Sequence, residues 1–453
     1  MTPWAKNKRP LRISGNDKVN GNGANGGGGP VLSQGWSSTV RHEKLRIALY
    51  SHDTMGIGHM RRNQLIAKAL ASSALQPNVL MLCGAREACF FDTPPGVDCV
   101  TLPSLAKRCD GVYHARRLDV QLGELIRLRG QILRSTLEAF DPDVLIVDKV
   151  PRGALCELNP ALELLKNRGN AKMVLGLRDV LDDPQIVADE WTRDDGEQAV
   201  RDYYDAVWVY GSEEVYDVAR RYCFASDVAE KIRYAGYLQR YTLNGDGASE
   251  ALPLRLPQGP LVLCMVGGGQ DGAHVAEAFA QAALPAGATG VIVTGPFMPP
   301  DAQQRIAAMA KLRRSLRVLE FVPNIDALMR RATRVVAMGG YNTVCELISL
   351  RKPSLVVPRT RPRREQHIRA QNMRGLGLLD YVEPERLSPD TITHWLARPD
   401  AEVAPDPAAL ARIDFNGLGR LPRMLGELLA APAPVAVTTT TSSRPRAGAV
   451  HVA

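Results

Sequence analysis

The chain has 453 residues, of which 45% are hydrophobic and 23% are charged, and its formal net charge is +8. This composition is typical of a globular protein and excludes the collagen-like, disordered and membrane-spanning classes, while the length predicts two domains. The basic excess favours anionic partners. Because no nucleic-acid-binding motif accompanies it, a diphosphate is favoured over nucleic acid.

Both ends of the chain are predicted to be disordered. Residues 1–43 are rich in Gly, Asn and basic residues, and residues 431–453 include a Thr/Ser run; neither shows a hydrophobic period. No two of the eight cysteines form a CxxC pair, and residues 1–41 have no apolar signal-like core. These features predict a reduced, cytoplasmic protein without a zinc site.

Short apolar runs alternate with helical patterns after the leader, which indicates a parallel sheet covered on both faces. Strands are expected at 45–50, 79–83, 97–102, 144–147, 173–177 and 206–210, with helices at 63–71 and 122–140 among them. We therefore assign residues 44–240 to a first Rossmann-like domain.

Residues 241–259 contain Asn-Gly-Asp-Gly and several prolines, which is typical of a linker. A second series follows in residues 260–430, with strands expected at 261–266, 290–294, 316–321, 334–337 and 354–357. The predicted fold class is thus α/β, with two Rossmann-like, doubly wound domains facing across a cleft. Ligands of such sheets bind beyond the carboxyl ends of the strands.

The loop Gly267–Gly272 directly follows the first strand of the second domain and precedes a helix expected at 273–283. Its backbone N–H groups and the helix N-terminus favour a phosphate ligand. A tight turn with Asp271 as the helix N-cap is the alternative.

A second glycine turn, Gly339-Gly340, follows the strand expected at 334–337. Asn342 and Thr343 can engage a diphosphate there, and Glu346 can accept hydrogen bonds from a ribose diol. As the alternative, Glu346 only interacts with the dipole of its own helix.

Together these features resemble GT-B glycosyltransferases, in particular the peptidoglycan enzyme that transfers GlcNAc to lipid-linked muramyl-pentapeptide and the monogalactosyldiacylglycerol synthases. The resemblance is best over 260–377, and it implies donor contacts from two glycine turns, a base-binding strand end and a Gln pair. The matching residues here are Gly267, Gly268, Gly269 and Gln270; Phe321 and Val322 after Glu320; Gly339, Gly340, Asn342, Thr343 and Glu346; and Glu365 with Gln366. Glu365 departs from the paired Gln of the family, which leaves the contacts to the sugar hydroxyls open.

The first-strand loop of the family, with its GxGH pattern, resembles residues 50–59. The resemblance places Gly58 at the donor and a base in this loop. The imidazole of His59 could take the acceptor proton or hydrogen-bond the diphosphate; in the alternative, it is a structural or solvated histidine. His52, Asp53 and Asp148 are competing candidates. The string that continues to Asn63 is most similar to bacterial predicted glycosyltransferases of unassigned substrate.

Charged residues after two other strands are expected near the acceptor. Arg178 and Asp179 end the strand at 173–177, and Lys149 follows Asp148. In the alternative, these residues pair with one another. Four arginines at 359, 361, 363 and 364 crowd one loop, which favours a bound anion or else a solvated basic loop.

The predicted reaction is therefore hexosyl transfer from a nucleotide diphosphate sugar, UDP-linked, to an acceptor hydroxyl, inverting and without a metal or cofactor. The acceptor, glycan or lipid-linked, is unassigned, with envelope or exopolysaccharide synthesis as the expected setting and peripheral contact with the inner face of the membrane left open. A non-hydrolysing UDP-sugar 2-epimerase and a non-catalytic nucleotide-sugar-binding protein are the alternatives.

Overall fold

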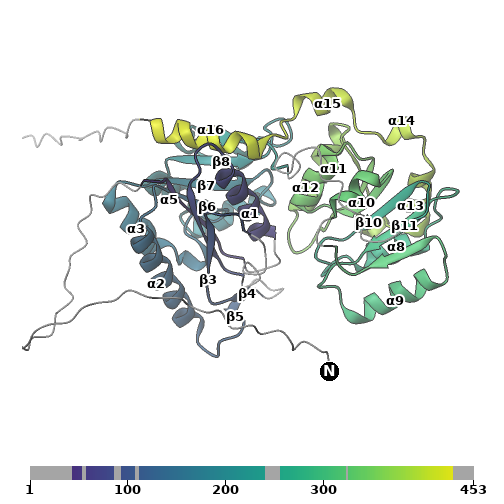
Figure 1. Ribbon diagram of the computed structural model, residues 1–453, viewed down its shortest axis with the longest axis horizontal. Helices are drawn as coiled ribbons and strands as arrows, with labels where there is room; N and C mark the ends of the chain where they lie inside the picture. The colour runs from purple at the N-terminus through teal and green to yellow at the C-terminus, as the bar shows by residue number, and fades with distance from the viewer. Residues whose placement is uncertain are drawn as a thin grey trace, which may run out of the picture. The chain divides into compact units, whose positions relative to one another are not determined.

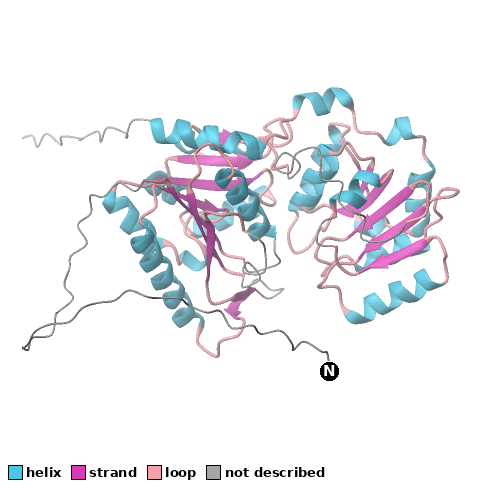
Figure 2. Cartoon of the chain, viewed as in Figure 1, coloured by secondary structure: helices cyan, strands magenta, loops and turns pink. Residues whose placement is uncertain are grey.

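A computed structural model describes residues 43–53, 58–85, 93–107, 112–239, 256–322 and 325–431, which belong to one compact unit that begins at Glu43. The expectations for residues 1–42, for residues 54–57 of the first-strand loop, for most of the linker and for residues 432–453 lie outside these ranges. Two sheets flanked by helices make up the described chain (Figures 1 and 2).

The first sheet has seven parallel strands in the order β3-β2-β1-β6-β7-β8-β9. Because helices cover both faces, most strand residues are buried, as the continuous apolar runs predict. The strand order reverses between β1 and β6, whose carboxyl ends therefore open the ligand-binding crevice. The strands are β1 (Arg46–Ser51), β2 (Asn78–Cys83), β3 (Val97–Thr101), β6 (Val144–Asp148), β7 (Lys172–Arg178), β8 (Ala206–Tyr210) and β9 (Ile232–Tyr234).

The second sheet has six parallel strands in the order β12-β11-β10-β13-β14-β15. Its order reverses between β10 and β13, the two strands that the predicted glycine turns follow. The strands are β10 (Leu261–Met265), β11 (Thr289–Val293), β12 (Leu316–Leu319), β13 (Arg334–Met338), β14 (Ser354–Val357) and β15 (Asp380–Tyr381). The two Rossmann-like domains and the GT-B fold class are thereby confirmed.

Helices connect the strands of both sheets. Those of the first domain are α1 (Gly58–Ala71), α2 (Leu122–Phe140), α3 (Asn159–Arg168), α4 (Pro184–Arg193), α5 (Gly196–Tyr203), α6 (Val218–Arg221) and α7 (Ser226–Ala229). Those that follow β10 are α8 (Ala273–Gln281), α9 (Pro300–Lys311), α10 (Asp326–Arg331), α11 (Tyr341–Ser349), α12 (Glu365–Gly375), α13 (Pro389–Ala397), α14 (Asp400–Val403), α15 (Pro407–Arg412) and α16 (Gly417–Ala430). A short hairpin, β4 (Leu105–Lys107) and β5 (Tyr113–Ala115), was not expected from the sequence.

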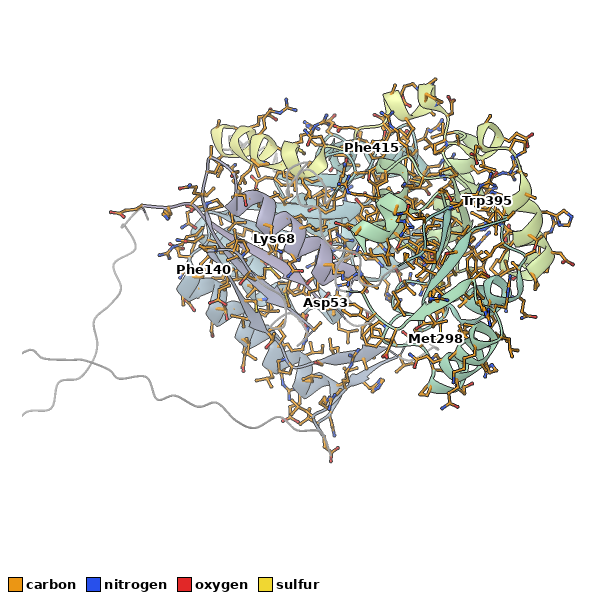
Figure 3. All side chains as sticks on the ribbon, turned by 45° about the vertical axis from the view of Figure 1, so that its right-hand side comes forward. Asp53, Lys68, Phe140, Met298, Trp395 and Phe415 are labelled. Atoms are coloured by element: carbon orange, nitrogen blue, oxygen red, sulfur yellow. The ribbon has the colours of Figure 1, made fainter. Side chains whose placement is uncertain are left out.

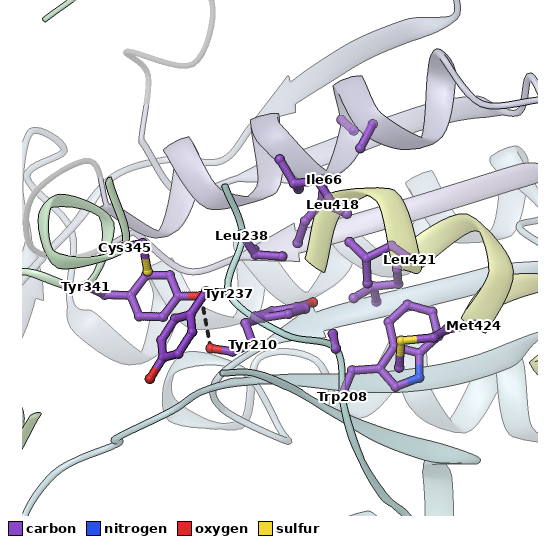
Figure 4. Packing of buried hydrophobic residues seen from close by; sticks show 14 of the residues in the cluster. Ile66, Trp208, Tyr210, Tyr237, Leu238, Tyr341, Cys345, Leu418, Leu421 and Met424 are labelled. Atoms are coloured by element: carbon purple, nitrogen blue, oxygen red, sulfur yellow. Dashed lines mark hydrogen bonds between the residues drawn. The ribbon is translucent and has the colours of Figure 1, made fainter. Parts of the chain in front are cut away.

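The last helix, α16, packs on α1 of the first domain rather than on the second sheet. Leu418, Leu421 and Met424 of α16 join Ile66 of α1 and Trp208 of β8 in one apolar core (Figure 4). The chain thus returns to the first domain at its end, whereas the expected second domain, residues 260–430, includes α16. The domain boundaries stay a prediction.

Only glycine fits where this return begins. A Cβ on Gly417 would lie 2.7 Å from the carbonyl oxygen of Gly236. The close approach lets the backbone of Gly417 donate a hydrogen bond to Tyr237, at 3.0 Å, and fixes the start of α16 against the end of the first domain.

Candidate active site

A cavity of about 1380 Å³ lies where the carboxyl ends of the two sheets meet. Loops after β1, β6 and β7 line it from the first domain, and loops after β10, β13 and β14 line it from the second. Both switch points therefore open into the same cavity, as expected for a doubly wound pair. Among the expected donor residues, all except Gly339 line it, and among the other candidates His52, His59, Lys149 and Arg178 do so.

His59 lies in the first turn of α1 and is hydrogen-bonded to Asp148, the last residue of β6. Nδ1 of His59 lies 2.5 Å from Oδ2 of Asp148, and Nε of Arg62 donates to Oδ1 of the same carboxylate at 3.0 Å. Asp148 is 2% exposed and does not line the cavity, whereas His59 does. The pair therefore presents the imidazole, not the carboxylate, to a ligand.

Burial and the neighbouring charges set the protonation of this pair. Burial lowers the pKa of His59 to about 4, although the carboxylate of Asp148 acts in the opposite direction. Burial alone would raise the pKa of Asp148, but Arg62 and His59 hold it well below its usual range. At neutral pH the site therefore holds a neutral imidazole against a charged carboxylate.

Sequence reasoning assigned no role to Arg62, and the structure places it at the centre of this group. Its guanidinium lies 5.8 Å from the ring centroid of Tyr341 and 6.0 Å from that of Tyr210. The hydroxyl of Tyr341 donates to the carbonyl oxygen of Tyr210 at 2.9 Å, which joins α11 to β8 (the dashed line in Figure 4). The spacing of His59 and Arg62, three residues apart on one helix face, is the signal that could have paired them.

Asp53 and His52 follow β1 but differ in their surroundings. Asp53, labelled in Figure 3, accepts hydrogen bonds from Ser51 Oγ at 2.5 Å and from the backbone N–H of Gly84 at 3.2 Å, and it does not line the cavity. This position argues against Asp53 as the base. His52 lines the cavity with its ring centroid 5.0 Å from that of His59, and burial lowers its pKa well below the usual value.

The Gly267–Gly272 loop turns directly into α8. Its N-cap is Gly272, without a side-chain hydrogen bond, so the alternative with Asp271 as cap is wrong. Gly267 and Gly269 have φ angles of 61° and 90°, and a Cβ on Gly269 would meet the Thr294 oxygen at 2.2 Å. Glycine is thus required by conformation and by the neighbouring loop. The backbone N–H groups of Gly268 and Gln270 have no partner among the described residues.

The second glycine turn leads into α11, which has nine residues and no side-chain N-cap. Its open N-terminal N–H groups, with Asn342, Thr343 and Glu346, line the cavity. Gly339 lies behind this surface, where its carbonyl oxygen accepts a hydrogen bond from Nη1 of Arg369 at 3.2 Å. Its expected contact with the donor is therefore indirect at most.

Glu365 and Gln366 begin α12 and face the cavity. Arg359 binds Oε1 of Glu365 at 2.7 Å and donates its backbone N–H to the Gln366 side chain at 3.1 Å. Burial alone would raise the pKa of Glu365, but Arg178 and Arg359 lower it. Its buried Oε2 has no partner among the described residues and stays able to accept a hydrogen bond from a hydroxyl.

Three of the four arginines in the loop after β14 pair with carboxylates of the protein, and the fourth, Arg361, is exposed, so their charges do not require an anion. Arg359 also binds Asp271, at 3.2 Å, and Arg364 binds Asp183 at 3.0 Å. Arg363 binds Asp182 at 2.8 Å and also Glu190 of α4. The pairs of Arg363 and Arg364 join the loop after β14 to the first domain.

Asp179 has a structural position rather than one at the acceptor. Both Asp179 and Arg369 are 0% exposed, and Nη2 of Arg369 donates to Oδ1 of Asp179 at 2.7 Å. Tyr237 donates to the other oxygen at 3.1 Å. Its partners use both oxygens of Asp179, whereas the neighbouring Arg178 lines the cavity.

Known proteins share this architecture and the second domain. Residues 263–401 match the glycosyltransferase family 28 C-terminal domain. The chain resembles the UDP-N-acetylglucosamine–N-acetylmuramyl-(pentapeptide) pyrophosphoryl-undecaprenol N-acetylglucosamine transferase of Klebsiella pneumoniae, with 29% identity over 36% of this chain and 48% of that one. The chain has the GT-B fold, and its second domain is similar to the C-terminal domain of family 28 glycosyltransferases. The expected resemblance to that transferase family is thereby confirmed, although the chain spans only about half the length of this relative.

Further relatives cover more of the chain. An uncharacterized glycosyltransferase of Methanosarcina acetivorans is 25% identical over 66% of this GT-B chain and 73% of its own. The structure of CalG4, the calicheamicin glycosyltransferase, matches with a TM-score of 0.57 and 16% identity, covering 87% of this chain and 100% of that one. A putative UDP-N-acetylglucosamine 2-epimerase of Listeria monocytogenes reaches 0.57 at 11% identity, covering 86% and 96%. At such identities the solved structures establish the fold alone.

Proposed function

We propose that this protein transfers a hexosyl group from a nucleotide diphosphate sugar, UDP-linked, to an acceptor hydroxyl. The observation that carries the proposal is the pairing of His59 with Asp148 at one switch point, opening into the cavity that the open N–H groups of the other switch point also line. A base and a diphosphate cradle around one cavity are what glycosyl transfer requires.

The donor lies mainly on the second domain. Its diphosphate oxygens accept hydrogen bonds from the N–H groups of the Gly267–Gly272 loop and of the α11 N-terminus. These groups stabilise the negative charge in place of a metal. Glu346 accepts hydrogen bonds from the ribose diol, and Phe321 and Val322 border the nucleotide base. Glu365, whose Oε2 has no partner among the described residues, and Gln366 form hydrogen bonds with the sugar hydroxyls.

His59 acts as the general base. The carboxylate of Asp148 lies against Nδ1, and Nη2 of Arg62 lies 3.0 Å from the same nitrogen. The shorter contact with the carboxylate favours the tautomer with its proton on Nδ1 and leaves Nε2 as the acceptor atom. The acceptor oxygen attacks the anomeric carbon while its proton moves to Nε2, and the bond from that carbon to the diphosphate oxygen breaks. The charge on Asp148 stabilises the imidazolium that forms. One displacement of this kind inverts the anomeric configuration.

The acceptor and the pathway follow less directly. The relative from Klebsiella pneumoniae is named for a lipid-linked acceptor, and we extend to this chain the expectation of a glycan or lipid-linked acceptor in envelope or exopolysaccharide synthesis. Within the described residues, no helix combines the length and apolarity needed to cross a membrane. Peripheral contact with the inner face of a membrane belongs to the same proposal.

Product analysis with radiolabelled UDP-sugars and an acceptor panel tests the function. We expect UDP release to depend on the acceptor and to fall roughly 10²–10⁴-fold in His59→Ala. His394→Ala, which removes an exposed histidine of α13, is the matched control and should keep full turnover. Conversion of the UDP-sugar to its 2-epimer without an acceptor would instead support the epimerase. UDP binding without turnover on any acceptor would support the non-catalytic alternative.

A further inference from the structure

Lys149 and Arg178 are two cations of the cavity that have no ion-pair partner among the described residues. They follow the neighbouring parallel strands β6 and β7, and both line the cavity. In the part of the chain that the structure describes, neither side chain donates a hydrogen bond or forms an ion pair, and Nε of Arg178 is buried without a partner. Such groups lose hydration without compensation, so a ligand atom is expected there.

Three other arginines around them each have an ion-pair partner, although Nε of Arg359 is also buried without a hydrogen-bond partner among the described residues. Arg62 binds Asp148, Arg359 binds Glu365, and Arg363 binds Asp182. The absence of partners at Lys149 and Arg178 is therefore a local property of these two side chains and not a general feature of a basic cavity wall.

The backbone of Lys149 is held in an unusual conformation. Its φ angle is 68°, in the left-handed region that residues other than glycine rarely adopt. Its backbone N–H donates a hydrogen bond to the carbonyl oxygen of Gly176 at 2.8 Å. Such strain is unfavourable and clusters at ligand-binding positions. Here it places the ammonium group in the cavity wall, one residue after Asp148.

The surroundings leave the pair charged at neutral pH. Burial, and then the charges of Arg178 and Arg363, lower the pKa of Lys149 to about 8, while Glu190 of α4 and Glu365 of α12 act in the opposite direction. Burial likewise lowers the pKa of Arg178, against the effect of Glu365. Two like charges held close together are relieved when an anion binds between them.

We propose that Lys149 and Arg178 bind a carboxylate or phosphate group of a sugar substrate, separate from the diphosphate of the nucleotide. The inference rests on the proposed function, because it takes the diphosphate to lie against the Gly267–Gly272 loop of the other domain. Since Lys149 directly follows Asp148, the bound group sits close to the reacting hydroxyl. It belongs either to the acceptor or to a uronic acid at the donor.

Calorimetric titration of inorganic phosphate into the protein saturated with UDP tests this site. We expect phosphate to bind the wild-type protein without displacing UDP, and to bind at least about tenfold more weakly to Lys149→Met and to Arg178→Met. Arg361→Gln is the matched control, because it removes one charge from an exposed side chain that does not line the cavity. If Arg178→Met does not fold, the phosphate affinities of Lys149→Met and Arg178→Lys test the site instead.

Three results would overturn the inference: no phosphate binding to the UDP complex, phosphate that displaces UDP, or equal binding by the variants and the wild type. Failure to bind UDP contradicts the proposed function instead. Phosphate is then titrated into the free protein, where binding that both variants lose still supports the pair and no binding overturns it.

A second set of phosphate titrations, with UDP-glucose or UDP-glucuronic acid in place of UDP, shows whether the bound anionic group belongs to the donor or to the acceptor. If UDP-glucuronic acid alone excludes phosphate, and loses affinity in Lys149→Met, the anion is on the donor sugar. If both UDP-sugars leave phosphate bound, the anion belongs to the acceptor, and the acceptor panel narrows to acidic sugars and sugar phosphates. If both UDP-sugars exclude phosphate, the pair binds a group that all donors share, which overturns the inference.

Discussion

Oδ2 of Asp148 lies 2.5 Å from Nδ1 of His59, and this contact joins the end of β6 to the first turn of α1. Because parallel strands bring their carboxyl ends to one edge, residues that are 89 positions apart meet there. The contact leaves one ring nitrogen of His59 to the cavity and keeps the carboxylate out of it, so the two residues have different expected phenotypes.

Asp148→Asn should lower kcat by about 10²-fold or more and leave UDP affinity within about twofold, because it removes the charge that stabilises the imidazolium and not a donor contact. Steady-state kinetics with parallel UDP titration checks this. Asp183→Asn, an acidic residue outside the cavity lining, is the control with unchanged kcat. An Asp148→Asn variant with normal kcat would contradict the role of this pair.

The pH dependence should follow the lowered pKa of His59, which is about 4 in the folded protein. The base must be unprotonated, so kcat/KM is retained as the pH falls through the usual histidine range and is lost only near pH 4. A kcat/KM profile measured between pH 4 and pH 9, within the range of stable folding, tests this. An acid limb centred near pH 6.5 would show that the imidazole is not buried as described.

Asp53 should make the fold less stable at neutral pH. Burial raises the pKa of its carboxyl to about 6, whereas the unfolded chain has the ordinary value. Its protonated form is therefore favoured by folding, and this contribution is full below about pH 4 and lost as the pH rises through 6. Asp53→Asn should be more stable than wild type by about 1–3 kcal/mol at pH 7.5, with a difference that shrinks toward pH 4. Urea unfolding at the two pH values measures it, and a pH-independent difference would refute the shift.

The buried pair of Arg369 and Asp179 should contribute to stability rather than to chemistry. Asp179→Ala leaves a buried guanidinium unpaired and should cost about 3–5 kcal/mol in the free energy of unfolding. Glu214→Ala, which breaks the exposed pair with Arg412, should cost less than about 1 kcal/mol. Equal losses in thermal or urea unfolding would mean that Asp179 is not buried between the domains.

The sheets could be predicted because buried parallel strands read as continuous apolar runs. The helix expected at 122–140 and the strand expected at 206–210 begin and end as predicted. The return of α16 to the first domain could not be predicted, because it depends on contacts distant in the sequence. The hairpin β4–β5 is local, but its strands of three residues are too short to show a hydrophobic period.

The candidate site was predictable where a loop alone defines it. The two glycine turns and His59 line the cavity as expected. Whether a charged residue faces the cavity or a partner could not be predicted, because that depends on pairing across the fold. Asp179 is hydrogen-bonded inside the protein through both of its oxygens, and Asp53 is bound by Ser51 and Gly84 through one of its two. Lys149 and Arg178 instead line the cavity without an ion-pair partner among the described residues.

Calorimetric titration with UDP, GDP, TDP and ADP, with and without EDTA, tests the central claim most directly. We predict metal-independent UDP binding that Glu346→Ala weakens by about 1–3 kcal/mol through loss of the ribose contact, and that His59→Ala leaves unchanged. Binding of no nucleotide, or equal losses in Glu346→Ala and His59→Ala, would contradict a nucleotide-sugar donor site on the second domain with its base on the first.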